Sequence, residues 1–191
     1  MKVMTLVGSV RPGSYCRATA MAVDAILTER GAEGEVWDPG EVPLPLANPC
    51  YHRDPAEHPD PNVQALVGTA DDSDAFVLVS PVYHNSYSAV LKNCLDHLAI
   101  AQFRHKPVVL VSHGAGLGAV QVCDHLRIVV RGLYGLALPQ QVVTIPDDFL
   151  PDEEGTPVLA NSPTLSRLEH ALTDLLFYAR VGQARLAGGA R

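Results

Sequence analysis

The sequence of 191 residues has no long hydrophobic run, no excess of positive charge and no closely spaced pair of cysteines. No apolar stretch approaches the roughly 18 residues that cross a bilayer, and no signal peptide precedes the first strand pattern. A net charge of −7 argues against nucleic acid as a partner. Because Cys16, Cys50, Cys94 and Cys123 form no C-x-x-C pair, free thiols in a reducing compartment are expected. These features predict a soluble, cytoplasmic protein.

Several familiar site patterns are also missing. The loop at 8–14 has neither the G-x-G-x-x-G spacing of a dinucleotide-binding loop nor the G-x-x-x-x-G-K-[ST] spacing of a P-loop. No serine lies in a G-x-S-x-G elbow, which argues against a serine hydrolase. Cys50, His52 and His58 match no zinc-ligand spacing, so no metal site is expected.

Apolar runs of strand length alternate with segments of helical periodicity along the chain. The predicted strands are 2–8, 35–38, 74–80, 107–112 and 138–145, and the predicted helices are 15–30, 62–72, 89–101, a segment after 114–118 that reaches about Tyr134, and 164–185. This alternation predicts a three-layer α/β sandwich with a parallel sheet. The expected strand order is 2-1-3-4-5, the flavodoxin-like order. We expect one domain over 1–185 and a frayed tail over 186–191.

One connection is long for a compact domain. Residues 39–60 are rich in proline and include two histidines. Such a segment is predicted to be irregular and exposed, and its length favours a role in binding or in contacts between subunits.

The loop at 8–14 leaves a buried strand and enters a helix. The free amides and the dipole at a helix N-terminus attract anions. Ser9 and Ser14 supply hydroxyls, and Arg11 can donate a charge-assisted pair of hydrogen bonds to phosphate oxygens. Alternatively, the two serines only shape the turn and cap the helix. At the helix start, Cys16 has either a packing role or a thiol with a lowered pKa.

A second loop follows the third strand, and ligands in such sheets lie where the strands end. In the segment 80–88, Pro81 has no amide hydrogen, and the amides of Val82, Tyr83 and His84 can turn toward a ligand. The alternative is a plain turn followed by a serine cap. Aromatic and imidazole side chains at a loop tip contribute little to a core, which favours a binding role.

A third loop, from Ser112 to Gly118, follows the fourth strand and contains three glycines. Glycine lets the backbone approach a ligand closely, although a tight strand-to-helix turn needs glycine too. Taken together, the three loops predict a ligand with a phosphate at one end and a flat polar ring at the other.

The chain resembles the NADPH-dependent FMN reductases of flavodoxin-like fold in three segments: Gly8-Ser9-x-Arg11-x-x-Ser14, Ser80-Pro81-x-Tyr83-x-x-Ser86-Tyr87-Ser88-x-x-Leu91-Lys92-Asn93-x-Leu95-Asp96, and the glycine-rich loop at 114–118. The resemblance covers about residues 1–145. Within the second segment, the stretch from Pro81 to Lys92 is especially similar to the flavin reductases that supply reduced FMN to two-component monooxygenases.

This resemblance implies an oxidoreductase in which a hydride passes from NADPH or NADH to N5 of FMN, the cofactor that carries the chemistry. It implies contacts to the phosphate from Ser9, Arg11 and Ser14 with Cys16 nearby, to the ribityl chain and ring from Pro81, Val82, Tyr83, His84 and Ser86, and to the other ring edge from Ser112, His113, Gly114 and Ala115. No side-chain acid or base is required, and His84 is the candidate for contact with the reacting ring.

Three functions agree with these residues. The first is a flavin reductase that releases reduced FMN, with a flavin-dependent monooxygenase as its partner. The second is a reductase of quinones or azo compounds that keeps FMN tightly bound, and the third is an electron carrier without NAD(P)H activity. Val82 stands where quinone- and azo-reducing relatives often have Glu, and Cys16 stands where many relatives have Asn.

The resemblance also implies a homodimer or homotetramer. Lys92, Asn93 and Asp96, at the start of the third predicted helix, lie either at a subunit contact or on a solvated helix face.

Overall fold

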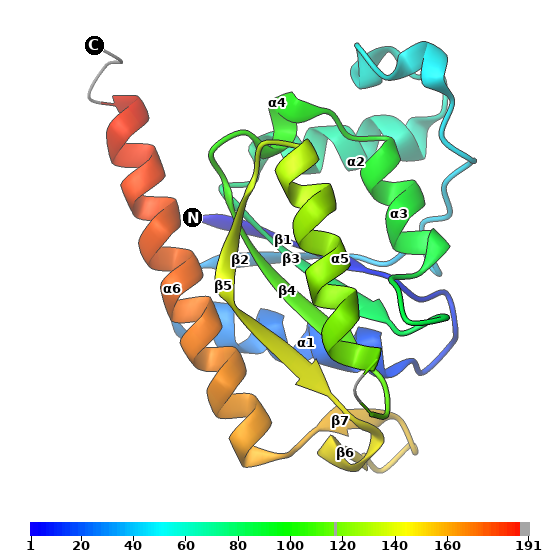
Figure 1. Ribbon diagram of the computed structural model, residues 1–191, viewed down its shortest axis with the longest axis vertical. Coiled ribbons are helices and arrows are strands. Elements are labelled where there is room, and N and C mark those ends of the chain that lie inside the picture. Colours follow the sequence, from blue (N-terminus) through cyan, green and yellow to red (C-terminus); the bar gives the residue numbers. More distant parts are fainter. Residues whose placement is uncertain (117, 188–191) are drawn as a thin grey trace.

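Five parallel strands form the central sheet of the computed structural model, which describes residues 1–116 and 118–187 (Figure 1). The strands are β1 (Lys2–Val7), β2 (Glu33–Trp37), β3 (Ala75–Pro81), β4 (Pro107–His113) and β5 (Leu136–Thr144). Their order is β2-β1-β3-β4-β5, which confirms the predicted order. The continuous apolar runs of β1 and β3 form central strands because both of their faces are covered.

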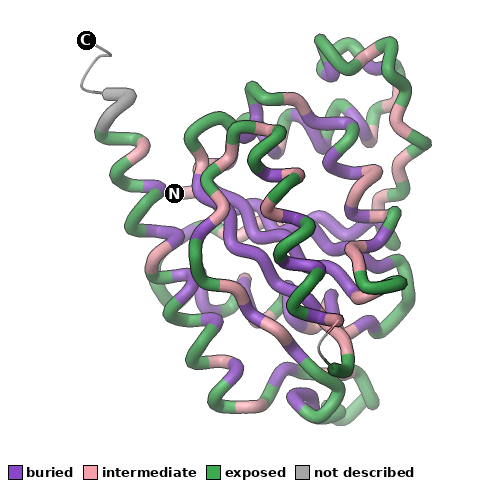
Figure 2. The backbone as a smooth tube through the Cα atoms, in the orientation of Figure 1, coloured by how far each residue is buried: buried purple, intermediate pink, exposed green. Residues whose placement is uncertain are grey.

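Helices cover both faces of this sheet. They are α1 (Tyr15–Glu29), α2 (Pro61–Asp72), α3 (Ala89–Asp96), α4 (Ile100–Phe103), α5 (Gly118–Gly132) and α6 (Ser162–Ala187). Alternate strand residues point to opposite faces. Val77 and Val79 pack with α1 and α6, whereas Phe76 and Leu78 pack with α2, α3 and α5. Figure 2 shows the resulting buried strands between partly exposed helices.

The helix predicted over 89–101 is in fact two helices, because α3 ends at Asp96 and α4 begins at Ile100. Between them Ala99 is extended, with φ −116° and ψ 178°, and its amide donates to the side chain of Gln102 at 2.9 Å. An extended residue at this position breaks the helical run.

A short hairpin that was not predicted follows β5. It consists of β6 (Phe149–Pro151) and β7 (Pro157–Leu159), preceded by the 3₁₀ turn η3 (Pro146–Asp148). The buried carboxylate of Asp148 accepts from the amide of Ile145 at 2.8 Å and from Thr164 Oγ1 at 3.1 Å. Strands of three residues are too short for a sequence period to reveal them, so this hairpin escaped prediction.

The segment 39–60 is irregular, as predicted, apart from the 3₁₀ turns η1 (Pro49–Tyr51) and η2 (Pro55–Glu57). Asn93 of α3 holds it: Nδ2 donates to the carbonyl of Pro45 at 2.8 Å, and Oδ1 accepts from the amide of Ala47 at 3.0 Å. Lys92 pairs with Asp96 one turn later. Asn93 therefore serves packing within this chain.

The last helix extends to Ala187, past the predicted end at 185. The remainder of the predicted tail, residues 188–191, lies outside the described residues. Within the described part of the chain, every helix is too short or too polar to span a membrane.

Hydrogen bonds tie the ends of β1 and β3 together. The amide of Gly8 donates to the carbonyl of Val79 at 2.7 Å, and a Cβ at position 8 would lie 2.8 Å from that oxygen. Ser88 Oγ donates to the carbonyl of Gly8 at 2.6 Å and accepts from the amide of Leu91 at 3.1 Å, as the N-cap of α3. The amide of Ser88 donates to Ser80 Oγ at 3.0 Å. One buried serine thus fixes the loops after both strands.

We expect Ser88→Ala to lower the free energy of unfolding by about 2–3 kcal/mol. It removes a helix cap and leaves the buried carbonyl of Gly8 without its donor. Urea unfolding gives this value, with Ser166→Ala on the exposed face of α6 as the matched control. Equal losses in the two variants would contradict the role of Ser88.

Candidate functional site

The structure brings the three predicted loops together at the carboxyl edge of the sheet. The loop at 8–14 follows β1, the loop at 82–88 follows β3, and residues 114–116 follow β4. The amide of Val82 donates to the carbonyl of His113 at 2.9 Å, so the second and third loops begin side by side. This edge is where ligands bind in open α/β sheets.

The first loop surrounds the N-terminus of α1. Ser14 is the N-cap and accepts from the amide of Arg17 at 3.1 Å, while Ser9 Oγ accepts from the amide of Arg11 at 3.3 Å. Both serines are buried. Within the described residues, the amides of Tyr15 and Cys16 have no acceptor, as expected for the first turn of a helix. The loop therefore combines unpaired amides with the positive end of a helix.

Arg11 is exposed and lies beside the ring of Tyr15, with Cζ 5.6 Å from the ring centroid. Within the part of the chain that the structure describes, no carboxylate lies within ion-pair distance of Arg11. Its charge is thus available to an anionic ligand.

Arg17, one turn into α1, differs from Arg11 because it is paired. Its guanidinium contacts the carboxylates of Asp38 and Glu41, and Asp38 also accepts from the amide of Gly40 at 2.8 Å. We did not predict this cluster from the sequence. The predicted strand order could have indicated this cluster, because that order places the end of β2 beside the helix that follows β1.

Cys16 belongs to the hydrophobic core and is 1% exposed. Burial raises the pKa of its thiol to about 12, and the nearby charge of Arg11 opposes this only in part. The structure therefore favours the packing role, and a lowered thiol pKa at the helix start is wrong.

The second loop is a tight two-residue turn. The amides and carbonyls of Tyr83 and Ser86 pair in both directions at 2.9 and 3.0 Å. His84 and Asn85 between them have φ values of 50° and 62°, the left-handed pair of a type I′ turn. Tyr83, His84 and Asn85 are exposed. This turn holds two ring-bearing side chains at the rim of the site.

This turn corrects the prediction about backbone amides. The amides of Val82 and Tyr83 donate to the carbonyls of His113 and Ser86, so neither points toward a ligand. Of the three amides that were predicted to face a ligand, that of His84 lies at the tip of the turn. Pro81 ends β3 in a fully packed position.

The second loop also packs against the start of α5. Ser86 Oγ lies 3.0 Å from His125 Nδ1, and a Cβ at Gly118 would lie 2.7 Å from Asn85 Oδ1. A Cβ at Gly114 would lie 2.7 Å from the side chain of Val82. At Gly114 a Cβ would therefore displace the side chain of Val82, whereas at Gly118 the exposed side chain of Asn85 could move aside. No local sequence pattern indicated that His125 contacts this loop.

Two predicted residues of the third loop, Ser112 and Gly114, make hydrogen bonds within the chain. Ser112 is fully buried and its hydroxyl donates to the carbonyl of Ala119 at 2.7 Å. The amide of Gly114 donates to the carbonyl of Thr144 at 3.0 Å. The side chain of Ser112 therefore supports the loop from within the core, while Ala115 is exposed at the edge of the site.

His113 packs against two aromatic rings that also contact each other. Its centroid is 4.5 Å from that of Tyr15 and 5.6 Å from that of Phe149, and Nδ1 lies 3.0 Å from Thr144 Oγ1. The Thr144 hydroxyl also lies within hydrogen-bond distance of the carbonyl of Ser112, at 3.3 Å. Sequence reasoning missed Phe149 because its hairpin was not predicted.

Burial, together with the positive charge of Arg11, lowers the pKa of His113 to about 4, although Asp148 opposes the shift. The imidazole is therefore neutral at pH 7. A cavity of about 340 Å³ adjoins this cluster, lined by Arg11, Gly13, Tyr15 and the β6–β7 hairpin. The site thus joins one unpaired cation, a helix N-terminus and a neutral aromatic cluster.

Curated relatives share most of this chain. An FMN-dependent NADPH-azoreductase of Staphylococcus saprophyticus is 37% identical over 161 residues, which cover 84% of this chain and 86% of the relative. An FMN-dependent NADPH-azoreductase of Staphylococcus aureus is 33% identical over 162 residues, 85% of this chain and 86% of the relative.

Solved structures share the fold. A flavoenzyme NAD(P)H:(acceptor) oxidoreductase from Paracoccus denitrificans aligns with a TM-score of 0.75 and 19% identity over 95% of this chain and 98% of that chain. The apo form of an NADH:FMN oxidoreductase aligns with a TM-score of 0.71 and 17% identity. The alignment covers 92% of this chain and 88% of that chain.

The family comparison agrees with the loops described above. The profile of the family described as NADPH-dependent FMN reductase matches residues 1–149, which include all three loops, the strands β1 to β5 and the helices α1 to α5. The chain belongs to the NADPH-dependent FMN reductase family.

Proposed function

We propose that this chain binds FMN and catalyses the transfer of a hydride from NADPH to FMN, with an azo compound or a quinone as the final acceptor. The observation that carries this proposal is the unpaired guanidinium of Arg11 beside the free amides of α1, next to two loops at the same sheet edge. The azoreductase relatives support the cofactors and the class of acceptor.

The donors at the start of α1 fit a phosphate monoester. Arg11 would donate to the phosphate oxygens, together with the hydroxyls of Ser9 and Ser14 and the amides of Tyr15 and Cys16. The thiol of Cys16 has no part in this, since it is buried in the core. A phosphate placed here would also be stabilised by the helix dipole.

The turn at 83–86 and residues 113–115 fit a flat polar ring between them. When bound, FMN supplies the ring whose N5 accepts the hydride. Tyr83, His84 and Ala115 would line this ring, while Ser86 is held by His125 and orients the turn. His113 stays neutral beneath the loop and keeps its backbone in place through Thr144.

Release of reduced FMN to a flavin-dependent monooxygenase is the second candidate function. The segment from Pro81 to Lys92 favours it, because this segment is especially similar to flavin reductases of two-component systems. The exposure of Tyr83 and His84 at the rim leaves a route by which a flavin can leave.

We further infer that the chain works in the cytoplasm as a single domain over 1–185 in a homodimer or homotetramer. The four free cysteines support a reducing compartment. Tyr83 is 52% exposed and Val120 is 41% exposed, and such apolar side chains at the rim offer a surface to a second chain. Light scattering that gives only the 20.5 kDa mass of one chain would contradict the oligomer.

Oxidation of NADPH by the purified protein tests the function directly. We expect a yellow protein that reduces methyl red or menadione without added FMN, at a rate that free FMN raises less than twofold. A colourless protein that oxidises NADPH only in proportion to added FMN would favour flavin release. No oxidation of NADPH under either condition would reject both functions and leave the electron carrier.

Arg11→Ala should weaken FMN binding by roughly ten- to a hundredfold, because it removes one charge-assisted contact to phosphate, worth about 1.5–3 kcal/mol. Titration of the flavin-free protein with FMN, followed by flavin fluorescence, measures this change. Riboflavin, which has no phosphate, should bind parent and variant equally. Arg53→Ala in the exposed 39–60 segment is the control, and an affinity of Arg11→Ala equal to this control would reject the phosphate site.

The low pKa of His113 predicts a loss of stability in acid. Because the pKa is about 4 in the folded chain and 6.5 in the unfolded chain, the unfolded chain binds more protons between these values. Stability should therefore fall as the pH drops from about 6.5 to 4, and His113→Phe should remove that part of the fall. Urea unfolding at pH 7 and pH 5 tests this, with the exposed His52→Phe as the control that should keep the slope of the parent.

A further inference from the structure

The ring of Tyr15, at the start of α1, is the partner that the structure gives to the side chain of Arg11. The guanidinium carbon lies 5.6 Å from the ring centroid, within the range of a cation–π contact. Both residues line the cavity of about 340 Å³ beside the β6–β7 hairpin. The ring therefore holds the guanidinium at the wall of a cavity.

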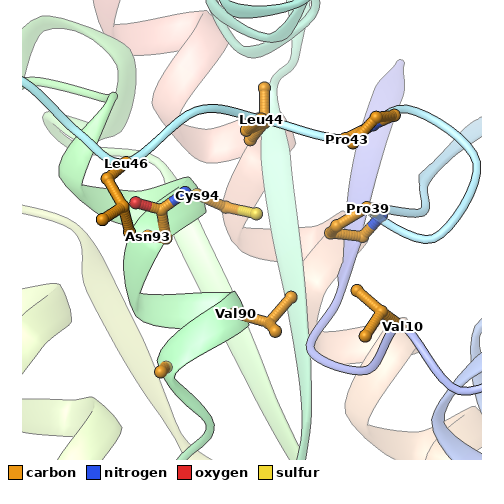
Figure 3. A pocket seen from close by; sticks show the side chains of 9 residues that line it. Val10, Pro39, Pro43, Leu44, Leu46, Val90, Asn93 and Cys94 are labelled. Carbon is orange, nitrogen blue, oxygen red and sulfur yellow. The ribbon is translucent and has the colours of Figure 1, made fainter.

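The backbone on the N-terminal side of Arg11 is fixed. Val10, the residue before it, closes one end of an apolar hollow together with Pro39 (Figure 3). The amide of Arg11 donates to Ser9 Oγ at 3.3 Å. The long side chain of Arg11 has no ion pair among the described residues, so its direction depends on the contact with Tyr15.

Two other rings hold the Tyr15 side chain in place. Its centroid lies 4.5 Å from that of His113 at the end of β4 and 4.6 Å from that of Phe149 in β6. These two rings contact each other at 5.6 Å. The backbone is fixed as well, because Thr19 Oγ1 donates to the carbonyl of Tyr15 at 2.8 Å. The ring under Arg11 is thus supported from α1, β4 and β6.

Phe149 can give this support because its own position is fixed. Its side chain is buried at the start of the hairpin. The carbonyl of the preceding residue, Asp148, accepts from the amides of Ala160 and Asn161 at 2.9 and 3.0 Å. These bonds close the base of the hairpin and keep Phe149 against Tyr15.

A ring and a carboxylate position an arginine with different consequences. The carboxylates of Asp38 and Glu41 hold Arg17 and also neutralise it. An aromatic ring attracts a guanidinium through the charge distribution of its face and brings no negative charge. Arg11 therefore keeps its charge for an anion. It also loses less rotamer freedom when an anion binds, because the ring has already restricted it.

We propose that Tyr15 is a positioning residue whose ring, supported by His113 and Phe149, directs the Arg11 guanidinium toward the phosphate of FMN. The inference rests on the proposed function, because it takes the phosphate site at the start of α1 as given. It assigns the ring of Tyr15 a role that is separate from that of its backbone amide.

NMR of the flavin-free protein tests whether the ring directs Arg11. A proton near the face of an aromatic ring is shifted upfield, so we expect an upfield Hε signal for Arg11 relative to that of the exposed Arg53. Tyr15→Leu should move this signal toward that of Arg53, and Tyr15→Phe should keep it. An Arg11 signal that Tyr15→Leu leaves unchanged would overturn the proposal.

Titration with FMN tests the consequence for binding. Tyr15→Leu should weaken FMN binding about two- to fivefold, the contribution of a cation–π contact at an exposed site. Riboflavin, which has no phosphate, should bind parent and variant equally, and Tyr15→Phe should restore the parent affinity for FMN. The matched control is Tyr134→Leu at the opposite edge of the sheet, where the ring lies 5.3 Å from Arg104. This control should bind FMN like the parent.

A double-mutant cycle separates positioning from packing. In an Arg11→Ala background, Tyr15→Leu should change FMN affinity by less than about 1.5-fold, because no guanidinium remains to be directed. The same loss with and without Arg11, or equal losses for FMN and riboflavin, would overturn the proposal. Tyr15→Met replaces Tyr15→Leu if that variant melts far below the parent.

Failure of this inference differs from failure of the proposed function. A parent protein that binds no FMN would reject both. A parent that binds FMN, together with a folded Tyr15→Leu variant of equal affinity, would reject the role of Tyr15 alone.

Discussion

The close approach of the first and third strands at Gly8 is the constraint on which the rest of the site depends. A side chain at this position would collide with the Val79 carbonyl, so the two strands can end side by side only with glycine there. Ser88 then binds the Gly8 carbonyl and caps α3 at once. Because these groups are buried, their hydrogen bonds lack competition from water and hold the loops in one register.

Two basic residues on the first loop and helix show how the fold separates binding from structure. Arg17 is neutralised by Asp38 and Glu41, and this cluster attaches the end of β2 to α1. Arg11 contacts the ring of Tyr15, and among the described residues no carboxylate lies within ion-pair distance of it. Its charge is therefore available to a ligand. The same positive charge helps to keep His113 neutral, which limits the cationic charge of the site to one group.

The sheet and the positions of the three loops could be predicted from the sequence, because buried parallel strands give long apolar runs and strand order places their ends together. The roles of single side chains could not. The ligand-binding pattern of Ser112 and Gly114 does not reveal that the first holds α5 and that the second packs against Val82. Phe149 lies in a strand of only three residues, and His125 contacts Ser86 only through tertiary packing. These contacts depend on how helices and strands pack against one another, and the periodicity of the sequence does not predict that packing.

The proline-rich segment shows how a long connection can be ordered without regular structure. The segment has no strand or helix to pair its backbone groups. Side chains do so instead: Asn93 and His97 hydrogen-bond to the backbone of Pro45 and Ala47. Asn62 likewise donates to the carbonyl of Pro43. The partners come from two helices that also pack against the sheet, so the segment shares their stability. Its apolar side chains are therefore held on a rigid support beside Val10 of the first loop.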